Sequence, residues 1–80
     1  MNVGMLWYDN DPRTALTAKV GRAADYYHQK YGLVPDLCLV HPTMLGEQPD
    51  LVGGLAGKVA VRPNRAILPG HLWIGTEDIN

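Results

Sequence analysis

Hydrophobic and polar residues follow a different period in each part of the chain, and the longest regular stretch predicts a helix. Between Asp11 and Gly32, hydrophobic residues return every three or four positions, as on a helix that packs one face against a core. Asp11 is suited to cap the first turn and Pro12 to occupy the first helical position, while Gly32 can end the helix in the left-handed conformation. The face expected to be buried consists of Leu16, Val20, Ala23, Ala24, Tyr27 and Tyr31.

Short uninterrupted hydrophobic runs flank this helix and favour strands. Val3–Tyr8 comes before it, Leu37–Val40 follows it, and His71–Gly75 lies near the end of the sequence. A strand, a helix and a second strand joined by short connections predict a β-α-β unit whose two strands are parallel.

The second half of the chain predicts a loop and then a hairpin. Glycine and proline interrupt residues 42–57 repeatedly, so we expect a loop there with at most a single helical turn. Residues 58–62 alternate in polarity, Pro63-Asn64 predicts a turn, and residues 65–68 are expected to return as the second strand of the hairpin.

These elements indicate an α/β protein of the two-layer α+β type. We expect a β-α-β unit followed by an antiparallel hairpin, in a mixed sheet of three to five strands with one long helix on one face. The chain of 80 residues is interpreted as a single domain over residues 1–76 with a frayed tail at residues 77–80.

Three of the predicted strands are hydrophobic at consecutive positions, over Met5–Tyr8, Leu37–Val40 and Leu72–Ile74, which is typical of strands covered on both faces. One helix covers only one face, so the glycine-rich loop, a second copy or a partner chain must cover the other. We therefore expect an interaction module that acts as a homodimer or a subunit, with Trp7, Trp73 and Tyr26 at the interface, because aromatic residues are enriched there. The alternative is that these aromatic side chains fill a small core.

Composition limits the function classes further. The formal charge of −1 and the pI near 6.2 do not favour a general nucleic-acid or membrane-surface binder. The sequence contains no run of about 20 hydrophobic residues that would span a membrane. The single cysteine, Cys38, cannot form an internal disulfide and is interpreted as a small buried hydrophobic residue, so we expect a cytoplasmic protein.

A basic cluster supports a second hypothesis. Lys58, Arg62 and Arg65 all fall on the predicted hairpin, and a basic hairpin can follow a nucleic-acid backbone. The same charges are also typical of a solvated sheet edge that resists aggregation. The alternative function is therefore a small nucleic-acid-associated protein.

Acidic residues and a histidine at predicted strand ends support a third hypothesis, a metal-dependent enzyme. Asp9 and Asp11 follow the first strand and His41 follows the second, at the edge where open α/β sheets bind ligands. The hydrophobic run into Asp-Asn-Asp is similar to the nucleophile loop of haloacid-dehalogenase-type phosphatases, although Pro12 and Arg13 displace the threonine of that family. Helix capping by Asp11 and strand termination by Asp9 explain both aspartates without a ligand, so no catalytic residue, metal or cofactor is assigned.

Overall fold

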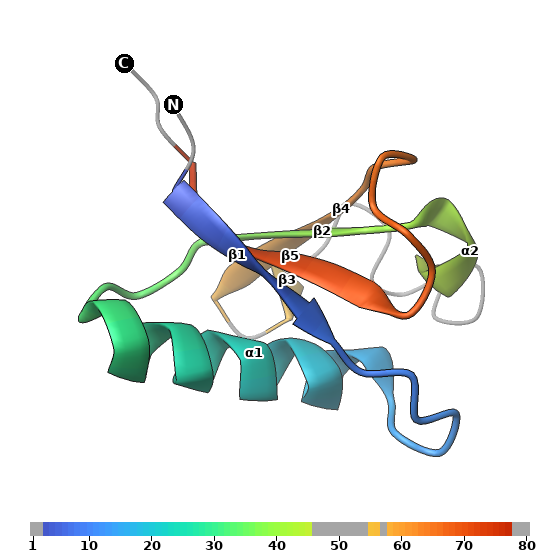
Figure 1. The fold of residues 1–80 in the computed structure, drawn as a ribbon, viewed down its shortest axis with the longest axis horizontal. Coiled ribbons are helices and arrows are strands. Elements are labelled where there is room, and N and C mark those ends of the chain that lie inside the picture. The colour runs from blue at the N-terminus through green and yellow to red at the C-terminus, as the bar shows by residue number, and fades with distance from the viewer. Residues whose placement is uncertain (1–2, 46–54, 57, 78–80) are drawn as a thin grey trace.

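The computed structural model describes residues 3–45, 55–56 and 58–77, and these form a five-stranded mixed sheet with one long helix packed on one face (Figure 1). This architecture confirms the predicted α+β class. In chain order the elements are β1 (Val3–Tyr8), α1 (Leu16–Tyr31), β2 (Leu37–Val40), α2 (Pro42–Leu45), β3 (Leu55–Ala56), β4 (Val59–Pro63) and β5 (His71–Thr76).

The strand order is β1-β5-β2-β4-β3, so the last strand of the chain lies inside the sheet. β5 pairs antiparallel with β1 on one side and with β2 on the other. The strands β1 and β2 therefore run parallel to each other, as the β-α-β pattern predicts, but β5 separates them. β4 pairs directly with β2 in the parallel direction, and β1 forms one edge of the sheet.

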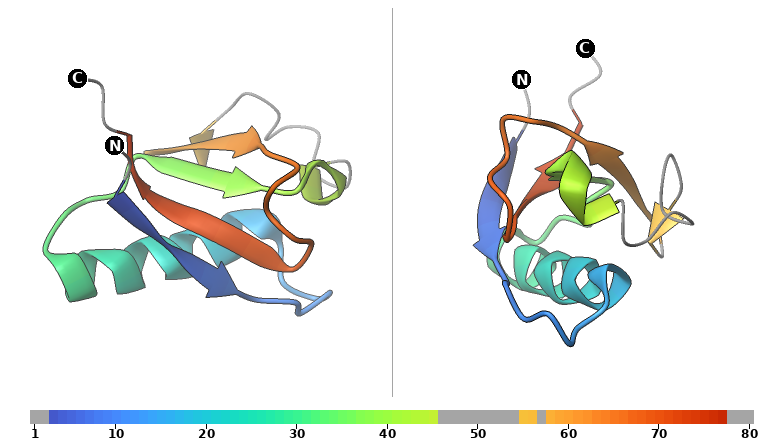
Figure 2. Two further views of the ribbon diagram at one scale, coloured as in Figure 1. Left: turned by 45° about the horizontal axis from the view of Figure 1, so that its top comes forward. Right: turned by 90° about the vertical axis from the view of Figure 1, so that its right-hand side faces the viewer.

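The antiparallel hairpin is present, but it joins β3 to β4 rather than β4 to residues 65–68. Residues 64–70 contain turns and arch over the end of β2 on the side of the sheet away from α1 (Figure 2). Asn64 directs this path, because its amide donates to the carbonyl of Val40 and its side-chain oxygen accepts from the amide of Ala66, each at 2.8 Å. The prediction that residues 65–68 return as the second strand of the hairpin was therefore wrong.

The helix begins at Leu16 instead of at the predicted Asp11–Pro12 boundary. Asp11 accepts from the amide of Arg13 at 2.9 Å and from the hydroxyl of Thr14 at 3.0 Å, so its carboxylate stabilises a turn before the helix. Ala15 is the N-cap and makes no side-chain capping bond. The predicted C-terminus is correct: Gly32 has a φ of 71° and donates its amide to the carbonyl of His28.

The core lies between α1 and the face of the sheet that the helix covers. The buried residues that form it are Leu16, Val20, Ala23, Tyr27, Cys38, Val40, Leu45, Val59, Val61, Leu72 and Ile74. Ala24 packs against this cluster, as predicted. Tyr31 does not enter it, because it lies on the last turn of α1, where its exposed ring contacts that of Tyr27 at 4.8 Å.

The predicted loop over residues 42–57 is only partly within the described structure. Its single helical turn is α2, which confirms that part of the prediction. Leu55–Ala56 forms the short strand β3, where a loop was expected. Residues 46–54 and 57 lie outside the described residues.

Candidate functional site

The sheet face opposite α1, which we call the open face, carries hydrophobic side chains that no helix covers among the described residues. Strand alternation divides the residues between the two faces, so that β1 directs Met5 and Trp7 toward α1 and Leu6 and Tyr8 toward the open face. Leu6 is 63% exposed and Tyr8 is 64% exposed. Among the described strands, β1 therefore carries the most solvent-exposed hydrophobic side chains of this face.

Trp73 and Leu39 continue this hydrophobic surface toward the middle of the sheet. Trp73 lies opposite Leu6 in the β1–β5 register and opposite Leu39 in the β2–β5 register, and both Trp73 and Leu39 are half-buried. We call Leu6, Tyr8, Leu39 and Trp73 the open-face patch. Leu37, farther along β2, is buried, so the exposure is concentrated on the β1 side of the sheet.

The position of Trp73 depends on Gly4. A Cβ atom added at Gly4 would lie 2.2 Å from Cζ2 of Trp73 and 2.8 Å from the carbonyl oxygen of Ile74. The indole ring therefore lies against the bare backbone of β1, a known way of packing an aromatic side chain over a strand glycine. This contact places the Trp73 ring beside the outer strand.

Tyr8 is positioned by contacts at the other end of β1. Its ring lies 4.9 Å from the ring of His71, which is its register partner on β5. A Cβ added at Gly70, which has a φ of 84°, would lie 3.4 Å from the Tyr8 ring. The Tyr8 side chain is thus supported on one side while most of its surface stays exposed.

The three predicted interface residues lie on opposite faces of the sheet. Trp73 belongs to the open-face patch, whereas Trp7 lies on the helix side and packs against Tyr26, with ring centroids 5.1 Å apart. Tyr26 is 46% exposed, and Nε1 of Trp7 is buried without a hydrogen-bond partner. All three lie near β1, because Trp7 belongs to this strand, Tyr26 packs against Trp7, and Trp73 packs against Gly4 of the same strand.

Sequence reasoning missed Leu6, Tyr8 and Leu39 as members of the site. The hydrophobic runs that contain them predicted a second sheet face that needs a cover. A run does not show, however, which of its residues are buried within the folded chain and which stay exposed. The useful signal was Gly4, because a glycine within a strand indicates close approach of another group. This glycine and the alternation after it place Leu6 and Tyr8 on the face that Trp73 shares.

The basic residues do not form the predicted hairpin surface. Lys58 precedes β4 and Arg65 follows it, so they lie at opposite ends of that strand, roughly 20 Å apart along the chain. The guanidinium of Arg62 lies 3.8 Å from a carboxylate oxygen of Glu77. Because residues 65–68 do not return along β4, the chain does not gather the three charges on one hairpin.

Asp9, Asp11 and His41 have local partners instead of forming one ligand site. Asp9 accepts from the amide of Asp11 at 3.1 Å and lies 3.9 Å from the guanidinium of Arg22. Nδ1 of His41 lies 2.8 Å from the hydroxyl of Thr43. Within the described parts of the chain, no three His, Cys, Asp or Glu side chains are grouped so that they could hold a metal ion.

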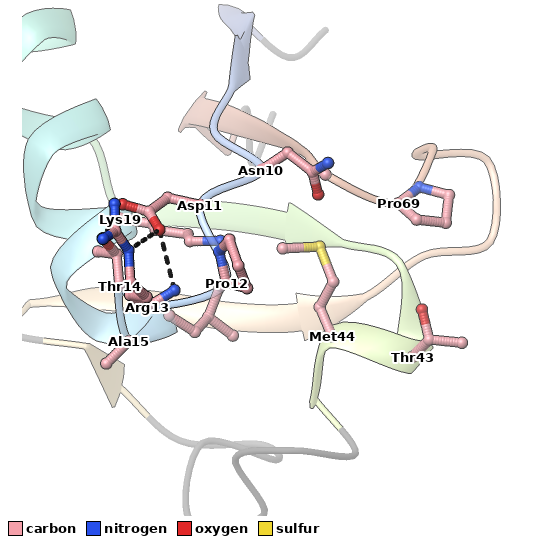
Figure 3. A pocket seen from close by; sticks show the side chains of 12 residues that line it. Asn10, Asp11, Pro12, Arg13, Thr14, Ala15, Lys19, Thr43, Met44 and Pro69 are labelled. Atoms are coloured by element: carbon pink, nitrogen blue, oxygen red, sulfur yellow. Dashed lines mark hydrogen bonds and ion pairs between the residues drawn. The ribbon is translucent and has the colours of Figure 1, made fainter.

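A cavity of about 480 Å³ lies beside the start of α1 (Figure 3). Lys19 lines it and is only 8% exposed, and its ammonium donates to the carbonyl of Asp9 at 3.1 Å. Asp11 also lines it, and the bond from the amide of Arg13, followed by that from Thr14, lowers the pKa of its carboxyl group. The charged side chains at this cavity thus stabilise the turn that leads into α1.

Cys38 is part of the core, as predicted. Burial raises the pKa of its thiol to about 12, because the apolar surroundings disfavour the thiolate. We expect the folded protein to react with a thiol reagent at pH 8 at least about a hundredfold more slowly than the unfolded protein. Measuring the reaction with and without guanidinium tests this, and reaction of the folded protein at the rate of a free thiol would contradict it.

The chain matches no known family model, and no curated protein or solved structure is significantly similar to it. None of the helices within the described residues is long and apolar enough to cross a bilayer. The fold and the open-face patch define a small α+β protein with an exposed hydrophobic surface.

Proposed function

We propose that this chain is a non-enzymatic protein-interaction module that acts as a homodimer or as a subunit, with the open face as its binding surface. The observation that carries the proposal is the exposure of Leu6 and Tyr8 beside Trp73, on a face that no helix covers in the described part of the chain. Contiguous exposed hydrophobic groups of this kind mark interaction sites on soluble proteins.

The composition of the patch fits a binding surface. It contains a tyrosine and a tryptophan, which are the residue types that contribute most to binding energy at protein interfaces. Polar side chains border it at two places, with His71 beside Tyr8 and Arg62 opposite Leu39 in the register. A hydrophobic centre with a polar border is the usual arrangement of such interfaces.

The test is the mass of the protein in solution as its concentration rises. We expect light scattering coupled to size exclusion to show the mass increasing from 8.8 kDa toward twice that value. The double variant Leu6→Ser/Tyr8→Ser is expected to stay monomeric, because it removes the hydrophobic groups that gain from burial.

The control changes an equal number of exposed hydrophobic residues elsewhere. Leu33 is 49% exposed and Val34 is 67% exposed, and both lie in the connection between α1 and β2. The variant Leu33→Ser/Val34→Ser should associate like the wild type. A wild-type mass of 8.8 kDa at every concentration, together with no binding of a hydrophobic probe dye, would refute the proposal.

A further inference from the structure

The free edge of β1 presents an unpaired row of backbone groups beside the open-face patch. The amide of Asp9 donates to the carbonyl of Gly70 at 3.0 Å, which makes these two residues a hydrogen-bonded pair of the β1–β5 ladder. Because such pairs alternate along antiparallel strands, Met5 and Trp7 also direct their backbone groups toward β5. Gly4, Leu6 and Tyr8 therefore direct theirs toward the free edge.

An independent contact on β5 supports this assignment. Gly75 is the register partner of Gly4, and its carbonyl accepts from the amide of Asp36 at 2.9 Å, on the β2 side of β5. Gly75 thus directs its carbonyl away from β1, as expected for a pair that is not hydrogen-bonded. The backbone groups of Gly4 face outward for the same reason.

The strand lacks the features that normally keep edge strands apart. Val3–Tyr8 contains no proline, lysine, arginine or carboxylate, and in the order of the described strands nothing lies beyond it. Natural edge strands are usually protected by charge, proline, a bulge or a covering element. An unprotected edge of six residues can accept another strand.

We infer that β1 pairs antiparallel with β1 of a second copy, with Leu6 opposite Leu6 of that copy. This inference rests on the proposed function and specifies its partner and geometry. The outward-facing residues are symmetric about Leu6, so Gly4 of each copy lies opposite Tyr8 of the other. The three pairs formed by these outward-facing residues are then of the hydrogen-bonded type, with two bonds in each. The pairing thus forms about six backbone hydrogen bonds.

The side chains on both sides of the edge fit a second copy. The Tyr8 ring of one copy reaches the Trp73 ring that lies over Gly4 of the other, and the two Leu6 side chains contact each other on the open face. On the opposite face, the half-exposed Tyr26 lies beside Trp7 of β1. The pairing thus places exposed hydrophobic groups against a second copy on both faces of the joined sheet.

Charge and area also favour a second copy. A strand without ionised side chains brings no like charges together when it pairs with itself, and the net charge of −1 gives little repulsion between copies. A standard interface covers about 800 Å² of each partner, roughly a sixth of the 5147 Å² of this chain. One strand pair lies at the lower end of that range, so we expect dissociation constants of about micromolar.

Cysteine cross-linking tests the register with a matched pair of positions. Leu6 and Tyr8 are equally exposed in one copy, but the proposed pairing places the two Leu6 Cα atoms about 5.5 Å apart and the two Tyr8 Cα atoms roughly 14 Å apart. Only the first distance permits a disulfide. We expect Leu6→Cys to form a linked dimer on mild oxidation and Tyr8→Cys to give at least tenfold less. Wild-type Cys38 is buried and serves as the blank.

Other cross-linking results would overturn the pairing. Equal yields at both positions indicate random collision or another interface, and a higher yield for Tyr8→Cys excludes this register. If the wild type still associates in light scattering, such results refute the β1 pairing and leave the proposed function intact. A wild-type mass of 8.8 kDa at every concentration refutes the β1 pairing, and together with no binding of the hydrophobic probe dye it refutes the proposed function as well.

Hydrogen exchange of the wild type provides a second measurement that needs no variant. The amides of Leu6 and Tyr8 should exchange about tenfold more slowly in concentrated than in dilute protein, because they become hydrogen-bonded in the dimer. The amides of Met5 and Trp7 already face β5 and should change much less. Equal concentration dependence at all four positions would contradict the pairing.

Discussion

Replacing Tyr27 with alanine is expected to lower the free energy of unfolding by about 3–5 kcal/mol. Tyr27 is among the largest fully buried side chains and lies on the face of α1 that packs on the sheet. Its removal leaves a cavity between α1 and the sheet, around which the structure relaxes only partly. In a domain of this size the melting temperature should fall by roughly 15–30 °C, measured by circular dichroism.

Tyr26, which is next to Tyr27 in α1, provides the control for this loss of stability. Tyr26 is half-exposed and contacts Trp7 from the side of the helix, so Tyr26→Ala should cost only about 1 kcal/mol. The two variants remove the same side chain from neighbouring positions of α1. Similar losses of stability for both would show that Tyr27 does not occupy the core position described above.

Replacing Gly4 with alanine is expected to destabilise the fold by about 1–3 kcal/mol and to displace the Trp73 ring. The new Cβ would lie 2.2 Å from Trp73 and close to a backbone oxygen, so the ring and the strand must both shift. Urea denaturation measures the stability, and near-ultraviolet circular dichroism reports the surroundings of the indole. Association should weaken as well, because the ring is part of the open-face patch.

Gly21 is the matched control for this substitution. A Cβ added there meets no atom within 4 Å, and the residue lies within α1. Gly21→Ala should stabilise the protein by about 0.5–1 kcal/mol, because alanine favours the helix and restricts the unfolded chain. If Gly4→Ala were as stable as Gly21→Ala, the close packing of Trp73 on β1 would be disproved.

Local sequence signals predicted the helix and most strands, but not the arrangement of the strands. The periodicity of α1 and the left-handed glycine that ends it depend on neighbouring residues, so the pattern was sufficient. The start of α1 was misplaced because Asp11 can bond either to a first helical turn or to a tighter turn involving Thr14. Both choices satisfy the same carboxylate, and only tertiary contacts, such as that of Lys19 with Asp9, distinguish them.

The position of β5 between β1 and β2 could not be predicted, because it joins residues more than sixty positions apart, such as Val3 and Thr76. The turn predicted at Pro63-Asn64 lies slightly later, because Pro63 still belongs to β4 and the amide of Ile67 donates to the carbonyl of Asn64. A turn signal also does not specify which strand the chain meets next. The Asn64 amide bonds to Val40, a contact between strands that are distant in sequence. The hairpin partner of β4 was therefore predicted in the segment that follows it, whereas its partner is β3, which precedes it.

The candidate site was predicted only as an uncovered face. Consecutive hydrophobic residues indicated a face that one helix leaves open, and no helix of the described residues covers it, but Leu37 is buried and Leu6 is exposed on that same face. The difference arises from their positions in the sheet, since β2 has neighbours on both sides and β1 is at the edge. Position within the sheet follows from the strand order, which the local pattern does not contain.

The interior location of β5 also has a consequence for biosynthesis. While the ribosome is still making residues 64–70, β1 has already emerged, but β5, its neighbour among the described strands, has not yet been made. A hydrophobic strand without charged side chains therefore stays unpaired in the nascent chain until residues 71–76 appear. The β1–β5 contacts that then form join residues far apart in the sequence, and such contacts form slowly. During translation, this strand is therefore an exposed hydrophobic segment that is prone to aggregate.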